Sequence, residues 1–191
     1  MGNSMGGWIS QKIAIDFPER VKSIIISAGP LEITKEWEIP LSNEEKKVLD
    51  ETMKLFSSRK EGKNLEETIQ NFLPIWKYCN VDIPFDEEMA KKFTRDFLTR
   101  TKNKNFMNHE KMMQNFLSSI KKTKNLEKID KPVLIIYGDK DFVVLPRHEK
   151  SVADSIPKSK LIIIKEMGHT FFNRDLEQRI VILLVDFLQS I

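Results

Sequence analysis

The residues best suited to chemistry lie in the segment MGNSMGG, where Ser4 is flanked by Gly2 and Gly6. This G-x-S-x-G spacing is typical of a serine held on a sharp turn between a strand and a helix. The two glycines are expected to let the backbone turn without steric conflict. The backbone N–H of Met5 is expected to face the oxygen of a carbonyl group under attack. Because a serine hydroxyl reacts only after a base removes its proton, the pattern requires a base elsewhere in the chain.

Two later segments could supply that base and a carboxylate to orient it. An apolar run at 132–137 leads into GDKD, which contains Asp139 and Asp141, and another at 161–164 is followed by EMGH, which ends at His169. Side chains that follow the carboxyl ends of parallel strands meet at one edge of the sheet, where open α/β sheets place their sites. We therefore expect His169 to be the base and either Asp139 or Asp141 to be the carboxylate.

The remaining candidates for chemistry are few. His109 lies in the middle region and His148 in an expected helix, so both are interpreted as surface or structural residues. No metal site is expected, because the sequence has no H-E-x-x-H, C-x-x-C or acidic cluster with ligand spacing. Cys79 is the single cysteine, which excludes an internal disulfide and favours a reducing compartment.

The composition argues against several classes of function. The net charge is +3 and lysines are mixed with glutamates, so no basic block indicates nucleic-acid binding. The longest apolar runs, such as 180–185, are far shorter than a membrane span. Residues 1–7 are rich in glycine and do not resemble a signal peptide. The sequence therefore predicts a cytoplasmic protein that binds neither nucleic acid nor membranes.

The elements that must position these residues are predicted by hydrophobic pattern. Three short β-branched runs have no alternation of polar residues, which predicts strands buried on both faces. They are residues 21–26, 132–137 and 161–164. Helices are expected at about 9–17, 147–156 and 175–191. Strands that alternate with helices predict an α/β fold with a parallel sheet.

Residues 31–125 have a different pattern. They are rich in lysine and glutamate, and their apolar residues recur at helical spacing, as at 89, 93 and 97. Pro40, Pro74 and Pro84 are expected to divide the region into several helices. An insertion of this length is too long for an ordinary crossover between strands. We therefore expect a helical cap, the cap region, over a core formed by 1–30 and 126–191.

These segments resemble the α/β-hydrolase superfamily. GNSMGGWISQKIAIDFPERVKSIIISAG resembles the stretch from the nucleophile elbow to the sixth strand. KIDKPVLIIYGDKDFVVLP resembles the seventh strand and acid turn, and LIIIKEMGHT the eighth strand and histidine loop. In the family's G-x-x-D turn the acid lies three residues after the glycine, so the resemblance assigns the carboxylate to Asp141. Ser4 and His169 match as nucleophile and base, in the order serine, aspartate, histidine.

Within the superfamily, residues 83–132 and 155–170 are similar to carboxylic esterases of the aclacinomycin methylesterase type. The resemblance implies a serine hydrolase that cleaves small-molecule esters through an acyl-enzyme and needs no cofactor. The cap region would then cover the site and set substrate preference. Hydrolysis of a thioester, a lactone or a carbon–carbon bond stays open, since these reactions use the same three residues.

The family's sheet normally has five strands before the elbow, roughly 90 residues with their helices. The resemblance implies that this chain lacks them, so we expect a truncated hydrolase with about three strands and an exposed edge along 21–26. One of two oxyanion donors would also be missing, which commonly costs ~10²–10³ in rate. We therefore expect poor stability and little activity. The alternative is a non-catalytic fragment that associates with itself, or with a separate N-terminal half, through that edge.

Overall fold

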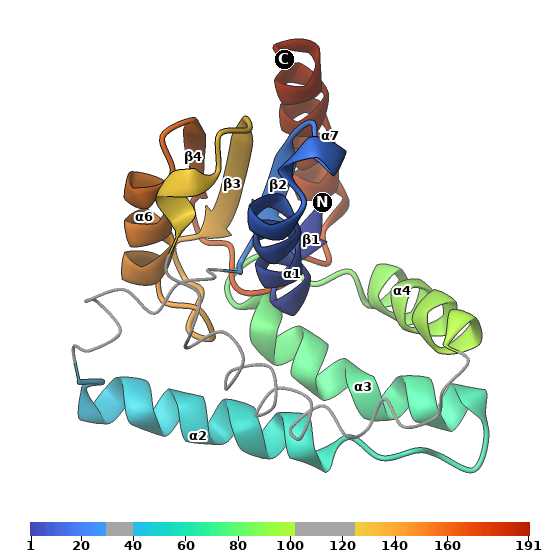
Figure 1. The fold of residues 1–191 in the computed structure, drawn as a ribbon. Helices are drawn as coiled ribbons and strands as arrows, with labels where there is room; N and C mark the ends of the chain where they lie inside the picture. Colours follow the sequence, from blue (N-terminus) through green and yellow to red (C-terminus); the bar gives the residue numbers. More distant parts are fainter. Residues whose placement is uncertain (30–39, 102–124) are drawn as a thin grey trace.

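The computed structural model describes residues 1–29, 40–101 and 125–191, and its centre is a parallel sheet (Figure 1). In the described residues this sheet has four strands in the order β1-β2-β3-β4. They are β1 (Gly2–Asn3), β2 (Ile24–Ser27), β3 (Val133–Gly138) and β4 (Ser159–Ile164). The predicted α/β fold with a parallel sheet is therefore confirmed. The strand added to the three expected ones is β1, which has only two residues.

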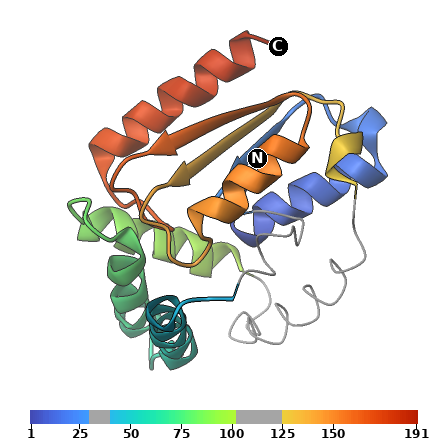
Figure 2. The same cartoon turned by 90° about the vertical axis from the view of Figure 1, so that its left-hand side faces the viewer.

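Helices cover both faces of the sheet, as Figure 2 shows. On one face, α1 (Met5–Asp16) packs against β2 and α6 (Pro146–Ser155) against β3 and β4, and their buried side chains form one apolar cluster with Ile24 and Ile26 of β2. On the other face, α7 (Arg174–Gln189) packs against Ile25. Successive strand residues point to opposite faces, so an unbroken apolar run such as that of β2 serves both layers. Two short 3-10 helices, η1 (Pro18–Arg20) and η4 (Leu126–Lys128), connect these layers.

Strand β4 differs from its prediction. It begins at Ser159 rather than at residue 161, and among the described residues it has β3 as its neighbour on one side only. The prediction that this segment is buried on both faces is wrong, because Ile163 is 54% exposed. An edge strand has fewer covering elements than a central strand, so an apolar side chain can reach solvent there. Strand β2 also begins later than predicted, at Ile24.

The opposite edge of the sheet is formed by β1. Gly2 pairs with Ile26 and Asn3 with Ser27, so β1 lies beside the carboxyl half of β2. The edge expected along residues 21–26 is therefore covered at Ile26. In the described part of the chain, no helix is long and apolar enough to cross a membrane.

Three further helices lie beyond the carboxyl ends of the strands (Figure 1). They are α2 (Asn43–Ser58), α3 (Leu65–Asn80) and α4 (Glu87–Arg100). Each begins after a side chain that accepts a hydrogen bond from a backbone N–H of the first turn, namely Ser42, Asn64 and Asp86. Such caps satisfy N–H groups that have no partner within the helix, so they fix where each helix starts.

The predicted break at Pro74 is wrong, because α3 continues through this residue from Leu65 to Asn80. A proline inside a helix removes one hydrogen bond and strains the preceding turn. Here the neighbouring Phe72, Leu73 and Ile75 are all buried, and their packing offsets that cost. Pro84 lies between α3 and α4 as expected, whereas His109 lies outside the described residues.

Candidate active site

Ser4 forms the turn between β1 and α1, with φ 50° and ψ −122°. A residue other than glycine is strained at positive φ, and such strain persists only where neighbouring contacts hold the backbone in place. The Ser4 N–H donates to the Ser27 carbonyl at 2.8 Å, and the Ser4 carbonyl accepts the Gly7 N–H at 2.9 Å. Because Ser27 ends β2 and Gly7 lies in the first turn of α1, the strained serine is held from both sides.

Of the two glycines expected to be required for this turn, only Gly2 is required by steric contacts. A Cβ on Gly2 would overlap the carbonyl of Gly6, whereas a Cβ on Gly6 would have no atom within 4 Å. The steric need expected at Gly6 is therefore wrong, and it falls instead on Gly29, where a Cβ would overlap the Ser4 carbonyl. The buried Gln11 amide donates to the Gly29 carbonyl at 2.6 Å and holds that residue against the turn.

We predict opposite results for two glycine substitutions around this turn. Gly29→Ala is expected to lower the free energy of unfolding by about 1–3 kcal/mol, because a methyl group must displace the Ser4 carbonyl. Gly6→Ala is the matched control, since its methyl group has free space inside α1 and alanine favours a helix over glycine by roughly 0.5–1 kcal/mol. Urea denaturation measures both, and equal stability of the two variants would contradict the described geometry.

The structure brings together Ser4, His169 and Asp141. The Ser4 Oγ lies 3.1 Å from His169 Nε2, and His169 Nδ1 lies 2.8 Å from Asp141 Oδ2. His169 is 6% exposed and Asp141 is 2% exposed. The second carboxylate oxygen of Asp141 accepts the N–H groups of Val143 and Val144, each at 2.8 Å. These contacts fix the direction of the carboxylate, so that Oδ2 points to the histidine.

Asp139, the other carboxylate considered, has a different contact. Its Oδ1 accepts the backbone N–H of Glu166 at 2.6 Å, which joins the turn after β3 to the end of β4. His148 is buried in α6, so it is structural rather than a surface residue. Within residues 1–29, 40–101 and 125–191, no three metal-ligating side chains are clustered.

Met5 is the first residue of α1 and directly follows Ser4. Backbone N–H groups in the first turn of a helix have no carbonyl partner within the helix, and the helix dipole adds positive potential there. Negative charge that develops beside Ser4 would therefore meet a favourable field. Acyl transfer requires such a field, because it stabilises the oxyanion that forms when the serine attacks a carbonyl group.

Glu149 of α6 is a feature that the sequence did not reveal. Its side chain is fully buried. Burial raises the pKa of Glu149 to about 8, repulsion from the Asp141 carboxylate adds to this effect, and the backbone of Gly29 opposes it. At neutral pH the side chain is therefore mostly an uncharged acid. The segment PRHEKSVADS has the polar pattern of a surface helix, so only the packing of α6 shows that Glu149 lies inside.

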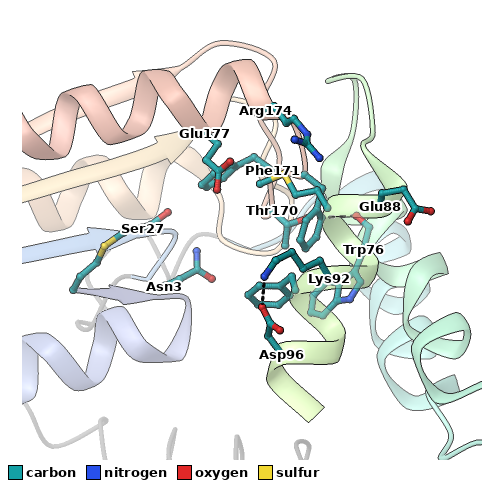
Figure 3. Close-up of a pocket in the computed structure, with 14 residues that line it drawn as sticks. Asn3, Ser27, Trp76, Glu88, Lys92, Asp96, Thr170, Phe171, Arg174 and Glu177 are labelled. Atoms are coloured by element: carbon teal, nitrogen blue, oxygen red, sulfur yellow. Dashed lines mark hydrogen bonds and ion pairs between the residues drawn. The ribbon is translucent and has the colours of Figure 1, made fainter. Parts of the chain in front are cut away.

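A cavity of about 650 Å³ borders the site, between α4, the start of α7 and the ends of β1 and β2 (Figure 3). Asn3 and Thr170, the neighbours of Ser4 and His169 in the sequence, are both part of its wall. Aromatic side chains form much of the rest, and they are Trp76, Phe93, Phe171 and Phe172. Charged side chains add a polar rim, including the ion pair between Lys92 and Asp96 at 2.6 Å. Apolar walls with a few polar groups are typical of small-molecule sites.

Comparisons with known proteins show the family and the fold of the chain. A family model described as serine aminopeptidase, S33, matches residues 1–176. Rhodomycin D methylesterase DauP of Streptomyces sp. (strain C5) is 25% identical over 184 residues, which cover 88% of this chain and 59% of the relative. Lipase 3 of Moraxella sp. (strain TA144) is 24% identical over 176 residues, which cover 88% of this chain and 49% of the relative. The chain thus spans roughly half to three fifths of the length of these curated relatives.

Solved structures show the same fold. The meta-cleavage product hydrolase CumD from Pseudomonas fluorescens IP01 superimposes with a TM-score of 0.64 at 17% identity, over 99% of this chain and 63% of that chain. An esterase from Exiguobacterium antarcticum superimposes with a TM-score of 0.62 at 19% identity, over 98% of this chain and 65% of that chain. With the family match over most of its length, the chain belongs to the S33-type α/β hydrolases.

Proposed function

We propose that this chain carries the acyl-transfer site of a serine hydrolase that acts on carboxylic esters of small molecules. The observation that carries the proposal is the continuous series of contacts from Ser4 Oγ through the His169 ring to Asp141, at 3.1 and 2.8 Å. Hydroxyl, imidazole and carboxylate in this order form the apparatus for nucleophilic acyl transfer. The names of the relatives, a methylesterase and a lipase, support an ester as the substrate.

In the proposed reaction, Ser4 Oγ attacks the ester carbonyl carbon while its proton passes to His169 Nε2. The carbonyl oxygen becomes an oxyanion that accepts the Met5 N–H. His169 then gives the proton to the leaving alcohol, which leaves an acyl group on Ser4. Water attacks this acyl group by the same proton path and releases the acid. Asp141 orients the His169 ring and stabilises the imidazolium.

The cap region is proposed to set the substrate. Its helices α3 and α4 contribute Trp76, Met89 and Phe93 to the cavity beside the site. An ester with an apolar or aromatic group would bury that group against these side chains. Residues 1–30 and 126–191 would then supply the core that carries the chemistry.

A fluorophosphonate probe tests the proposal, because it reacts with an activated serine and needs no known substrate. Although ester turnover is expected to be low, we expect one adduct on Ser4, located by intact mass and peptide mapping, and complete loss of labelling in Ser4→Ala. Ser10→Ala is the matched control, since Ser10 lies in α1 and its hydroxyl only donates to the Gly6 carbonyl at 2.8 Å. It should label at the wild-type rate.

An adduct that persists in Ser4→Ala, or that maps to another serine, would overturn the proposed nucleophile. If Ser4 is labelled, a panel of aryl esters, thioesters, lactones and vinylogous 1,5-diketones would define the bond that is cleaved. Ester turnover above the others supports the proposed substrate class, and faster carbon–carbon cleavage would replace it.

A further inference from the structure

The turn after α3 lies directly against the loop that carries His169, here called the histidine loop (residues 165–173). The Thr170 N–H donates to the Cys79 carbonyl at 3.2 Å, and Val81 forms an isolated bridge with Met167. A Cβ on Gly168 would overlap the same Cys79 carbonyl. The backbone at the end of α3 is therefore in direct contact with the backbone of the histidine loop.

Asn80 ends α3 and joins these two segments through its side chain. It is fully buried. Its Oδ1 accepts the Phe172 N–H at 2.7 Å, and its Nδ2 donates to the Ile83 carbonyl at 2.5 Å. Because one partner is a donor and the other an acceptor, only this orientation of the amide satisfies both. Few other side chains of this size could make the two bonds at once.

The histidine loop has no regular secondary structure, so single contacts fix its position, such as that of the Lys140 N–H with the Met167 carbonyl at 3.1 Å. Apart from the single bridge at Met167, residues 165–173 form no helix or strand. The backbone of Phe172 is held at both of its polar groups, since its carbonyl also accepts the Asp86 N–H at 2.7 Å. Phe172 follows His169 by three residues, so a displacement of Phe172 can reach His169 through a short stretch of backbone.

We propose that Asn80 is a positioning residue that holds the histidine loop where His169 can take the proton of Ser4. The inference rests on the proposed function, because positioning His169 matters for activity only if Ser4 is the nucleophile. The contacts that Asn80 makes with the histidine loop do not depend on that function. Proton transfer requires a distance of about 2.6–3.2 Å between heavy atoms, and the Ser4–His169 contact of 3.1 Å is near the upper limit. A small outward shift of the loop would therefore break the contact.

Three variants test this role. Asn80→Leu keeps a similar volume and removes both hydrogen bonds, and it is expected to lower the fluorophosphonate labelling rate of Ser4 by ~10–100-fold. Asn80→Asp keeps an oxygen that can accept the Phe172 N–H but places a second oxygen against the Ile83 carbonyl, so it should recover only part of that loss. The matched control is Thr94→Val, which removes the bonds of a buried Thr94 to Ala90 and Trp76 within the cap region. Its rate per folded molecule should stay within about twofold of wild type.

A second measurement does not depend on reactivity. The ¹⁵N chemical shifts of the His169 ring report which nitrogen carries the proton. The wild type and Thr94→Val should hold the Nδ1–H form that donates to Asp141, whereas Asn80→Leu should show a mixture of the two forms.

The outcomes separate the two proposals. If the wild type is labelled and Asn80→Leu is labelled at the same rate, the role of Asn80 is overturned and the proposed function remains intact. Absence of wild-type labelling would count against the proposed function, and the ring shifts would then decide the role of Asn80. Identical shifts in wild type and Asn80→Leu would reject that role, and a mixture found only in Asn80→Leu would support it.

Discussion

Asp141→Asn is expected to lower the labelling rate of Ser4 by about 10⁴-fold while the protein stays folded. In the wild type, Asp141 Oδ1 accepts two backbone N–H groups and Oδ2 accepts the His169 Nδ1 proton. All of these partners are donors, so the site requires an acceptor on both sides of the carboxylate.

An asparagine at this position has one acceptor and one donor. If its NH₂ group faces His169, the ring must accept at Nδ1 and carry its proton on Nε2, where it cannot take the proton of Ser4. If the NH₂ group faces Val143 and Val144, donors oppose donors and the turn is destabilised. The first arrangement removes the base and the second destabilises the turn, although the shape of the side chain is almost unchanged.

The matched control for this prediction is Asp139→Asn. Asp139 Oδ1 accepts one backbone N–H, from Glu166, and an asparagine oxygen can do the same. We expect its labelling rate to stay within about threefold of wild type. Circular dichroism would show that both variants are folded. Similar losses in the two variants, or less than a tenfold loss in Asp141→Asn, would contradict the assignment of the carboxylate.

The second large effect concerns stability and pH. Glu149→Gln is expected to raise the free energy of unfolding at pH 8 by on the order of a few kcal/mol, and to change it little at pH 4.5. Burial raises the pKa of Glu149 from 4.5 to about 8. Between these values the unfolded chain loses the proton and the folded chain keeps it. The contribution of Glu149 to the stability of the wild type is therefore fully present below pH 4.5 and is lost as the pH rises toward 8.

Glutamine has nearly the same shape and does not ionise, so the variant should lack this decline. Urea denaturation at pH 4.5, 6 and 8 measures it. Asp154→Asn is the control, because Asp154 lies in the same helix with an exposed side chain paired to Lys150. It should follow the wild-type pH dependence. Parallel curves for wild type and Glu149→Gln would show that the buried carboxyl group does not titrate as described.

The positions of the three side chains of the candidate site could be predicted from the sequence because local patterns define them. Ser4 lies between glycines, and Asp141 and His169 each follow an apolar run. Such runs form parallel strands, and their carboxyl ends meet at one edge. The choice of Asp141 over Asp139 needed the family's spacing, since both residues lie in the same short turn.

The remaining features depend on contacts between distant segments, which a local pattern does not contain. Asn80 is one polar residue at the end of a helix, and only its partners in the histidine loop distinguish it. Glu149 is buried because α6 packs against β3 and β4. Pro74 was expected to end a helix, but the burial of its neighbours outweighs its local preference.

The separation of the reactive residues along the chain has a consequence for biosynthesis. Ser4 and His169 lie 165 residues apart, while Asp141 precedes His169 by 28. The ribosome therefore makes the serine long before it makes the histidine, and long-range contacts of this kind form late in folding. During synthesis Ser4 is an ordinary hydroxyl without a base. Under the proposed function, a chain released before the histidine loop would carry no activated serine and could not acylate itself on cellular esters.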